Sequence, residues 1–583
     1  MQMNVTVATM LLQSMLERLE NKEGAPFASS FELAALRFCI ESLQAEAAVP
    51  SPTAAETALT ETSISATKPA LGQTGEGFEK EGGCNPVVGY MTQALLSHED
   101  EPSHESQVEQ PEVFLNVDSL KRTVPTLPGL TVCLDFGTAM SKAFAALGYG
   151  QPLELELGVA AGFEGFLLPS TLFIGTDERM YFGQEAQEKE DATGSEKHKR
   201  IDSIKSSISQ WGPHTPDVDI APLDSDVNPS QTIRLTKGDA IRLYLAYFSD
   251  MAAEALALHP GYSEEDSRYV LRRYARPCWP NPEQQEVADA KMREMLEQAQ
   301  ILADTFRGEW FGGIPLVRLK RALDKVRELG ARPSYLVDVG IPEPVAVASG
   351  VIYETENARD AFMVVDAGAG TTDLGLFVVT KRDEVVTVHQ VANSIRGLMQ
   401  AGDKVDNLLR SVIADREGVD RSDTHGREVW DDLSRRLRPL KEALFTRGTL
   451  SYVLSDGTMG TLTKAEFLND TRVVRFSQQI EDEFVRSLSS VDDTWLAWLA
   501  RAPMRLKVVV TGGSGNLDMM QALARGVIDV KGYKIEREPL NVVPSWVQDS
   551  VPMQSVYPQL AVAIGGVNPD LPHVKTAPAY LGR

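Results

Sequence analysis

The stretch "VVDAGAGTTDLGLFVV", residues 364–379, decides the fold of this chain. An apolar run ends at Asp366, small residues follow, and a second apolar run begins after Asp373. Two such runs around a glycine-rich turn predict a strand-turn-strand hairpin. Backbone N–H groups of small residues can approach an anion closely, so the turn is a candidate phosphate-binding loop.

An earlier stretch repeats this plan. "LTVCLDFGTAMSKAFAALG", residues 130–148, has an apolar run that ends at Asp135, a turn with Gly137 and Thr138, and a second apolar run. The corresponding positions of the later copy are Asp366, Gly368, Gly370 and Thr371. The repeat predicts two phosphate-binding hairpins in one chain.

Two other phosphate motifs are excluded by the sequence. The chain has no G-x-x-x-x-G-K-[ST], so it has no Walker loop. "GAGTTD", residues 368–373, is not a dinucleotide fingerprint, because no helix is predicted after it and the third glycine is absent.

The two carboxylates at the strand ends are unexpected in a phosphate site, because they carry the same charge as phosphate. Two hairpins that face each other can hold the phosphates of a nucleotide from both sides. Asp135 and Asp366 would then hold the waters of a hydrated Mg²⁺ that bridges the β- and γ-phosphates. Taken singly, each hairpin is more simply interpreted as a glycine-rich turn with a solvated aspartate.

Length and charge limit the class of protein. A chain of 583 residues predicts roughly two to four domains. The net charge of −25 opposes binding to nucleic acid and to anionic membranes, so neither is an expected partner.

The cysteines and the hydropathy indicate the compartment. Cys39, Cys84, Cys133 and Cys278 form no CxxC pair, so neither a disulfide framework nor a zinc site is expected. No signal peptide and no apolar run of membrane-spanning length is recognised. A reducing cytoplasm fits these features best.

Composition divides the chain into three zones. Residues 1–47 predict a helical hairpin that packs on itself or on the main body, or else serves docking or dimerisation. Residues 48–125 are rich in Ala, Ser, Thr and Pro and predict a disordered linker. Within the linker, 85–100 is either a partner-binding motif or a chance apolar cluster. Protein partners are therefore expected to bind through 1–125, and residues 128–583 predict an α/β fold.

Five segments in order resemble the actin-like ATPase superfamily, and most closely its heat-shock 70 kDa (DnaK-type) branch. Over about residues 128–570 the resemblance implies a two-lobed fold of duplicated ribonuclease H-like lobes, each built on a five-stranded sheet, with ATP between them. The segments are "LDFGTAMSK", "VGIPEPVAVASGVIYE", "VVDAGAGTTD", "VVVTGGSGNLDMM" and "YPQLAVAIGG".

The resemblance also implies domain boundaries. Lobe I would span residues 128–350, lobe II 351–570, and a tail 571–583. The residues between the second hairpin and 508 would form the smaller subdomain of lobe II. The family's C-terminal peptide-binding domain is not expected here, and extra helices are expected within 282–335.

The resemblance assigns the catalytic residues. Glu343 matches the family residue that places the attacking water, which suits a carboxylate near a γ-phosphate. The simpler alternative is a glutamate before Pro344 that stabilises a helix N-terminus. Asp373 matches an acid near the metal and the water, and Asp366 acts with it. Thr138 and Thr371 would donate hydrogen bonds to phosphate.

Two lysines compete for the phosphates. Lys205 in "IDSIKSSISQW" (201–211) matches the catalytic lysine of the chaperones, and Lys142 matches the phosphate-loop lysine of actin. We expect Lys142 at the β-phosphate and Lys205 near the γ-phosphate. One of the two can instead be an ordinary surface lysine.

The nucleoside end is predicted from two segments. In "TGGSGN", Gly512, Gly513 and Ser514 would let the backbone approach the nucleoside. "RRLRPLKEALF", residues 435–445, resembles the helix that clamps adenine and ribose and supplies Lys441. Arg438 and Glu442 depart from the family pattern there. A swapped charge pair, a different purine grip and a solvent-facing charged helix remain open.

A basic strand in the first lobe has two interpretations. Arg272, Arg273 and Arg276 form an interaction face, or they pair with the acidic surface of the protein itself. We expect the second.

The expected function is an ATP-driven, slowly hydrolysing conformational switch that uses ATP/ADP and Mg²⁺ and acts through protein partners. It is chaperone-like but has no client-binding domain of its own. The alternative is an actin-like filament-forming ATPase, and the oligomeric state is left open. A small-molecule kinase of the same superfamily would need a base that deprotonates the hydroxyl of its acceptor, and none is recognised in this sequence. The intact Asp135, Glu343, Asp366 and Asp373 argue against a pseudo-ATPase.

Overall fold

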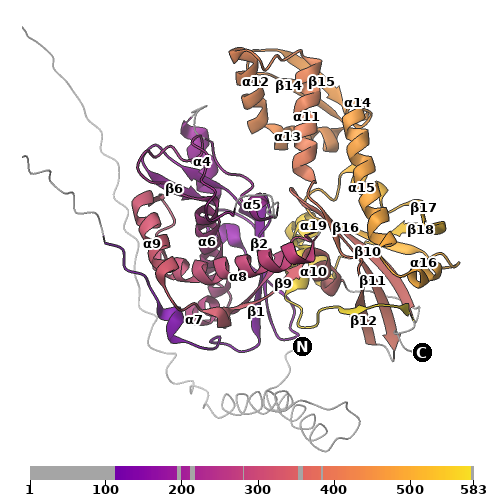
Figure 1. Ribbon diagram of the computed structural model, residues 1–583, viewed down its shortest axis with the longest axis horizontal. Coiled ribbons are helices and arrows are strands. Elements are labelled where there is room, and N and C mark those ends of the chain that lie inside the picture. Colours follow the sequence, from indigo (N-terminus) through magenta and orange to yellow (C-terminus); the bar gives the residue numbers. More distant parts are fainter. Residues whose placement is uncertain are drawn as a thin grey trace, which may run out of the picture. The chain divides into compact units, whose positions relative to one another are not determined.

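The computed structural model describes residues 112–193, 199–209, 217–279, 281–351, 359–382, 385–541 and 543–578. These residues mix helices with several mixed sheets (Figure 1), as an α/β fold requires. The predicted helical hairpin at 1–47 and the linker up to residue 111 lie outside the described residues. No described helix combines the length and apolarity needed to cross a lipid bilayer.

The first large sheet has six strands, in the order β3-β2-β1-β7-β9, with β4 beside β2. β1 pairs antiparallel with β2 and parallel with β7, and β7 pairs parallel with β9. Its strands are β1 (Leu130–Asp135), β2 (Met140–Leu147), β3 (Leu153–Glu154), β4 (Leu168–Pro169), β7 (Leu271–Arg276) and β9 (Val337–Pro342).

A small sheet and eight α-helices complete the described residues of this half of the chain. The small sheet holds β5 (Leu172–Ile174), β6 (Arg179–Phe182) and β8 (Ile314–Pro315). The helices are α3 (Leu157–Ala160), α4 (Gly183–Thr193), α5 (Ser206–Ser209), α6 (Lys237–Ala257), α7 (Glu264–Arg268), α8 (Pro282–Thr305), α9 (Leu316–Glu328) and α10 (Glu343–Gly350). α8 and α9 are the extra helices that the sequence predicts within 282–335.

The second large sheet has eight strands, in the order β17-β18-β16-β10-β11-β12-β19, with β13 beside β11. Its strands are β10 (Arg359–Ala367), β11 (Thr372–Arg382), β12 (Val385–Val391), β13 (Arg396–Leu398), β16 (Leu506–Thr511), β17 (Gly526–Val530), β18 (Tyr533–Pro539) and β19 (His573–Lys575). The resemblance implied five strands for each large sheet, and both sheets are larger because short edge strands extend them.

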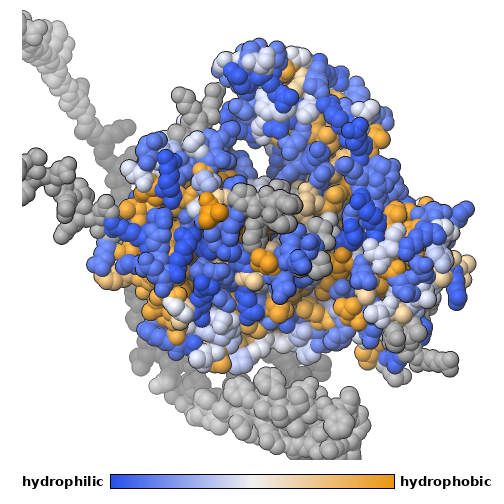
Figure 2. Space-filling model, in the orientation of Figure 1, coloured by the Kyte–Doolittle hydropathy of each residue, from blue (hydrophilic) through white to orange (hydrophobic). Residues whose placement is uncertain are grey.

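The helices of the second half lie around this sheet and above it in Figure 1. They are α11 (Gly402–Arg416), α12 (Thr424–Arg435), α13 (Leu437–Arg447), α14 (Lys464–Leu468), α15 (Thr471–Ser489), α16 (Asp493–Leu499), α17 (Asp518–Ala522), α18 (Ser545–Gln548) and α19 (Val551–Gly566). A separate two-stranded sheet joins β14 (Thr449–Val453) to β15 (Met459–Thr463). The face in view is mostly hydrophilic (Figure 2).

Both predicted hairpins are confirmed. β1 and β2 are antiparallel, and their last pair before the turn is Asp135 with Lys142. β10 and β11 are antiparallel, and Asp366 pairs with Asp373. Each aspartate of the opening motif therefore stands at the end of a buried strand, next to the turn.

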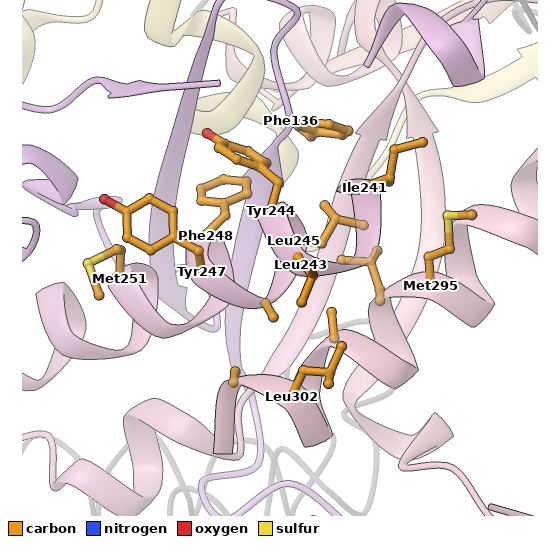
Figure 3. Packing of buried hydrophobic residues seen from close by; sticks show 14 of the residues in the cluster. Phe136, Ile241, Leu243, Tyr244, Leu245, Tyr247, Phe248, Met251, Met295 and Leu302 are labelled. Atoms are coloured by element: carbon orange, nitrogen blue, oxygen red, sulfur yellow. The ribbon is translucent and has the colours of Figure 1, made fainter. Parts of the chain in front are cut away.

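The core of the first half fixes the first turn. Tyr244 of α6 stacks on Phe136 with ring centroids 5.5 Å apart, and Figure 3 shows both rings among the buried side chains of α6. The Tyr244 hydroxyl donates to Ser141 Oγ, 3.0 Å away. Because Phe136 follows Asp135 and Ser141 precedes Lys142, this packing holds both ends of the turn.

α10 and α19 cross at very close range and each packs against both large sheets. A Cβ atom at Gly565 would lie 1.8 Å from the carbonyl oxygen of Ala346, and one at Gly350 would lie 2.8 Å from Cα of Gly565. Glycine at these positions therefore lets the two helices approach closely.

Gly565→Val is expected to lower the free energy of unfolding by about 3 kcal/mol or more, since the clash is with backbone and the helices must separate. Urea unfolding followed by circular dichroism measures this change. Gly330→Ala is the control, because a Cβ there meets nothing within 4 Å. Equal stability of the Gly565→Val variant and the wild type would contradict the crossing.

Two chain segments differ from their predictions. The linker was expected to reach residue 125, yet Val113 is buried, its carbonyl accepts from Lys325, and Asp118–Lys121 form a 3₁₀ turn. The sparse apolar residues of 112–125 pack on the core of the first half, which composition alone does not indicate. The tail contributes β19, which pairs parallel with β12.

The three arginines of β7 are used internally. Arg272 is buried and donates to Gln300 and to the carbonyl of Arg268. Arg273 and Arg276 form ion pairs with Asp338 and Asp289, respectively. The expectation of internal pairing is confirmed for these two, whereas the partners of Arg272 are neutral.

Candidate functional site

The two hairpin turns meet. A Cβ atom added to Gly370 would lie 2.9 Å from Oγ1 of Thr138, so the second turn touches the first. A Cβ atom at Gly137 would lie 2.0 Å from the carbonyl oxygen of Met140 within its own turn. These two glycines are needed for turn geometry and turn-to-turn contact.

A cavity of about 310 Å³ opens beside the two turns. Most of the predicted site residues line it, whereas Gly370 and Asp373 lie outside the lining. From the sequence-predicted set the lining includes Asp135, Gly137, Thr138, Lys142, Lys205, Glu343, Asp366, Gly368, Thr371, Lys441, Gly512, Gly513 and Ser514.

A larger cavity of about 1240 Å³ lies elsewhere, with Tyr149, Gly350, Trp546 and Leu571 in its lining. Its walls are mainly small and apolar residues and bring no cluster of carboxylates together. Because size alone does not make a reactive site, the smaller cavity is the better candidate.

Two ion pairs place the competing lysines. Nζ of Lys205 lies 2.5 Å from Oε1 of Glu343, and both side chains are buried. Nζ of Lys142 lies 3.1 Å from Oδ2 of Asp135. Both lysines therefore face the same cavity, and neither is a surface lysine.

The buried pair remains charged. Burial disfavours both charges, but the attraction between the two groups outweighs it, so the pKa of Lys205 is raised and the pKa of Glu343 is lowered. A carboxylate held in this form can accept a hydrogen bond from water once the ammonium group moves.

The second hairpin carries two further buried acids. Burial raises the pKa of Asp366 well above its usual range, and the charges of Glu343, Asp135 and Asp373 add to the effect. Oδ1 of Asp366 has no hydrogen-bond partner among the described residues. A hydrogen-bond donor or a cation at this position would therefore stabilise the buried carboxylate.

Asp373 lies behind Glu343 rather than in the cavity wall. Its Oδ1 accepts a hydrogen bond of 2.7 Å from the backbone N–H of Cys278. Burial, together with the charge of Glu343, raises the pKa of Asp373 to about 7. The residue is therefore poised to exchange a proton near neutral pH.

This raised pKa has a consequence for stability. The unfolded chain loses the Asp373 proton near pH 4, so between about pH 4 and 7 the native state binds more protons. The free energy of unfolding therefore contains a contribution from Asp373 that is lost as pH rises through this window. The melting temperature of Asp373→Asn minus that of the wild type is expected to increase from pH 5 to pH 8.

Calorimetry measures the difference in melting temperature between variant and wild type at pH 5 and at pH 8. A change in melting temperature that the substitution causes equally at both pH values does not affect the comparison. Asp415→Asn is the control, because its side chain is 69% exposed. A difference for Asp373→Asn that is the same at pH 5 and pH 8 would contradict the assignment.

The glycine turn after β16 approaches the second hairpin. Gly512 has φ +84°, and a Cβ there would lie 2.3 Å from the carbonyl oxygen of Ala367. Ser514 N–H donates to that same oxygen at 2.8 Å, and Gly512 N–H donates to the Pro558 carbonyl at 2.7 Å. The contact that requires glycine at 512 is therefore with the protein backbone, whereas a Cβ atom at Gly513 would lie 4.0 Å from Cγ of Gln559, an ordinary van der Waals contact.

α13 lines the cavity as well. Arg438 and Glu442 form an ion pair with each other at 3.2 Å, and their side chains are 54% and 62% exposed, which fits both the swapped charge pair and the solvent-facing charged helix. Lys441 instead reaches Asp406 of α11, with Nζ 2.7 Å from Oδ2. The partner of the predicted lysine thus comes from another helix.

Sequence reasoning missed several lining residues, which include Asp403, Asp406, Phe445, Asn516 and Gln559. The available signal was "GDKVDN", residues 402–407, where two acids three positions apart begin a helix soon after the second hairpin. Spacing of this kind puts both carboxylates on one helical face.

Six acidic and four basic side chains line the cavity. Among the described residues, no group of three or more His, Cys, Asp or Glu side chains is arranged to hold a metal ion directly. No protein-family model and no curated protein matched the sequence.

Proposed function

We propose that this protein is an ATP-binding, slowly ATP-hydrolysing conformational switch with the two-lobed fold of the actin-like superfamily, closest to the heat-shock 70 kDa type. One observation carries the proposal. Two hairpin turns that are far apart in sequence meet at one cavity, where Asp135, Lys142, Lys205, Glu343 and Asp366 converge.

The position of each residue in the cavity determines its proposed role in phosphate binding or in hydrolysis. The turns around Gly137 and Gly368 offer backbone N–H groups to phosphate oxygens, and Lys142 beside the first turn neutralises phosphate charge. Lys205 is drawn from Glu343 toward the γ-phosphate. Glu343 then accepts a hydrogen bond from the water that attacks γ-phosphorus, the bond to the bridging oxygen breaks, and ADP leaves.

The carboxylates fit a hydrated magnesium ion. Asp366 has a buried oxygen without a donor, and Asp135 faces the same cavity, so both can accept hydrogen bonds from metal-bound waters. Bound Mg²⁺ would neutralise charge on the β- and γ-phosphates. Asp373, behind Glu343, can take up a proton as phosphate forms.

Phosphate release and particle size, measured on the full-length protein in one tube, test this proposal. Slow phosphate release from Mg·ATP at constant light scattering, and loss of nucleotide binding when EDTA removes the metal, are expected. Nucleotide binding should depend on the metal because acidic side chains outnumber basic ones in the lining, so the lining alone does not neutralise the phosphate charge. No phosphate release and no nucleotide binding would overturn the proposal.

Light scattering also separates this switch from the filament alternative. Scattering that rises with Mg·ATP and decays as phosphate appears would identify a filament. Constant scattering would direct the search for partners to residues 1–125, the part of the chain for which the sequence predicts docking.

A further inference from the structure

Two arginines meet at one tryptophan outside the cavities described above. The guanidinium carbon atoms of Arg410 and Arg421 each lie 4.3 Å from the ring centroid of Trp430. None of these three residues lines the smaller or the larger cavity. The cluster is therefore separate from the residues to which the proposed function assigns a role.

The fold brings the three side chains together from two helices and the loop between them. Arg410 lies on α11, Trp430 on α12, and Arg421 in the loop that joins these helices (Figure 1). α11 and α12 pack against each other, and Val429 and Leu433 of α12 are buried. Trp430 itself is only half-buried, so its ring remains partly accessible to solvent beside the two guanidinium groups.

Neutral oxygens hold Arg410 in place. Its Nη1 donates to Oγ of Ser434 at 2.6 Å, and its Nη2 donates to Oδ1 of Asn407. Its Nε has no hydrogen-bond partner among the described residues. No described carboxylate forms an ion pair with this side chain. The guanidinium group of Arg410 is thus oriented, but its charge is not neutralised by a partner.

Arg421 is exposed, and Trp430 is the contact that its side chain makes among the described residues. Its guanidinium group has no hydrogen bond or ion pair with any of them. An arginine that lies over an aromatic ring keeps its N–H donors free for a ligand. Because the ring already restricts the side chain, less conformational entropy is lost when a ligand binds.

The two guanidinium groups repel each other. Burial lowers the pKa of Arg410, and the charge of Arg421 lowers it further, whereas the charge of Asp431 acts in the opposite direction. Asp431 forms no ion pair with either arginine. An anion that contacts both guanidinium groups would therefore replace this repulsion by attraction.

We propose that Arg410 and Arg421 bind a phosphate monoester group, and that the ring of Trp430 orients both arginines for it. A phosphate monoester carries about −1.5 to −2 charges near pH 7 and offers three acceptor oxygens, so two guanidinium groups can bind it at once. A carboxylate has a single charge, which one guanidinium group can match. Clusters of arginines recognise phosphorylated motifs in many proteins.

Titration calorimetry of the full-length protein with N-acetyl-O-phosphoserine amide and with inorganic phosphate tests this site. Mg·ADP is present throughout, because the turns of the smaller cavity are expected to bind phosphate as well. The wild type should bind a phosphate probe with a Kd on the order of 0.1–1 mM. Arg421→Gln should weaken this binding by roughly 10-fold or more and leave phosphate release from Mg·ATP unchanged.

Matched variants separate charge from geometry. Arg421→Lys keeps the charge but loses the planar fork, so it should weaken binding by roughly 3- to 10-fold. Arg475→Gln makes the same chemical change as Arg421→Gln at an exposed position of α15 and should keep the wild-type Kd. Trp430→Leu should weaken binding although it removes no charge. Thermal melts identify a variant that fails to fold, and the exposed Arg421 then decides.

The two probes distinguish the sources of the phosphate group. Tighter binding of the phosphoserine compound would identify a phosphorylated side chain of a partner protein as the ligand, and tighter binding of inorganic phosphate would identify free phosphate. N-acetyl-glutamate amide should bind at least roughly 10-fold more weakly than the better phosphate probe. Equal binding of the glutamate compound would overturn the assignment to phosphate.

Two further results would overturn the site itself. One is an equal Kd for the wild type and Arg421→Gln, and the other is no saturable binding of either phosphate probe to the wild type. The comparison of wild type with Arg421→Gln is made under identical conditions, so it remains valid if the proposed function fails and Mg·ADP does not bind.

Discussion

Asp366→Asn should lower phosphate release from Mg·ATP by roughly 100- to 1000-fold and leave ATP binding measurable. The carboxylate stands at the turn of the second hairpin, and its buried Oδ1 has no donor among the described residues. Asparagine keeps the shape but cannot carry the negative charge that orders the metal-bound waters.

The same substitution should stabilise the nucleotide-free protein. Burial and the neighbouring acids raise the pKa of Asp366. The native state therefore either holds a poorly solvated charge or takes up a proton that the unfolded chain has released. Asparagine removes this cost, and the melting temperature at pH 7.5 should rise by roughly 1–4 °C.

Steady-state phosphate assays, titration calorimetry and thermal melts of one preparation measure all three effects. Asp518→Asn, on an exposed residue of α17, is the control and should change none of them. Wild-type turnover of Asp366→Asn would remove Asp366 from the site, and a lowered melting temperature would contradict the electrostatic account.

Glu343→Gln should lower phosphate release about as much as Asp366→Asn does. Unlike Asp366→Asn, it should destabilise the protein. The substitution leaves the buried Lys205 ammonium group without its counter-charge. Removal of one partner of a buried ion pair typically costs about 3–5 kcal/mol of unfolding free energy. Urea unfolding of Glu343→Gln against the wild type measures this loss.

A double variant separates the two roles of the pair. Glu343→Leu with Lys205→Met replaces both charges by apolar groups of similar size, which is often neutral for stability. Stability should therefore return toward the wild-type value, whereas phosphate release should not. Recovery of hydrolysis in the double variant would show that neither residue takes part in the chemistry.

The hairpins were predictable because their signal is local. Alternating apolar residues, small turn residues and Asp135 and Asp366 lie within two short stretches, and the β1–β2 and β10–β11 registers follow from them. The presence of Lys142 and Lys205 in one cavity also followed from the resemblance, but their ion-pair partners did not.

The residues that sequence reasoning missed depend on contacts between distant segments. Lys441 meets Asp406 because α13 packs beside α11, a contact that no local pattern encodes. The ordered stretch that begins at Glu112 is similar, since its few apolar side chains find partners only on the folded core. Composition predicted disorder there because it reports how many apolar residues a segment has, and not which residues they contact in the folded protein.

The helix α10 spans the distance between two cavities. Its first residue, Glu343, lines the smaller cavity, and its last residues, Ser349 and Gly350, line the larger one. At Gly350 it bears directly on Gly565 of α19. Gly565 also lies against the carbonyl oxygen of Ala346, near the middle of α10. A tilt of α10 about that contact would move Glu343 and Gly350 in opposite directions and so change the shapes of both cavities together.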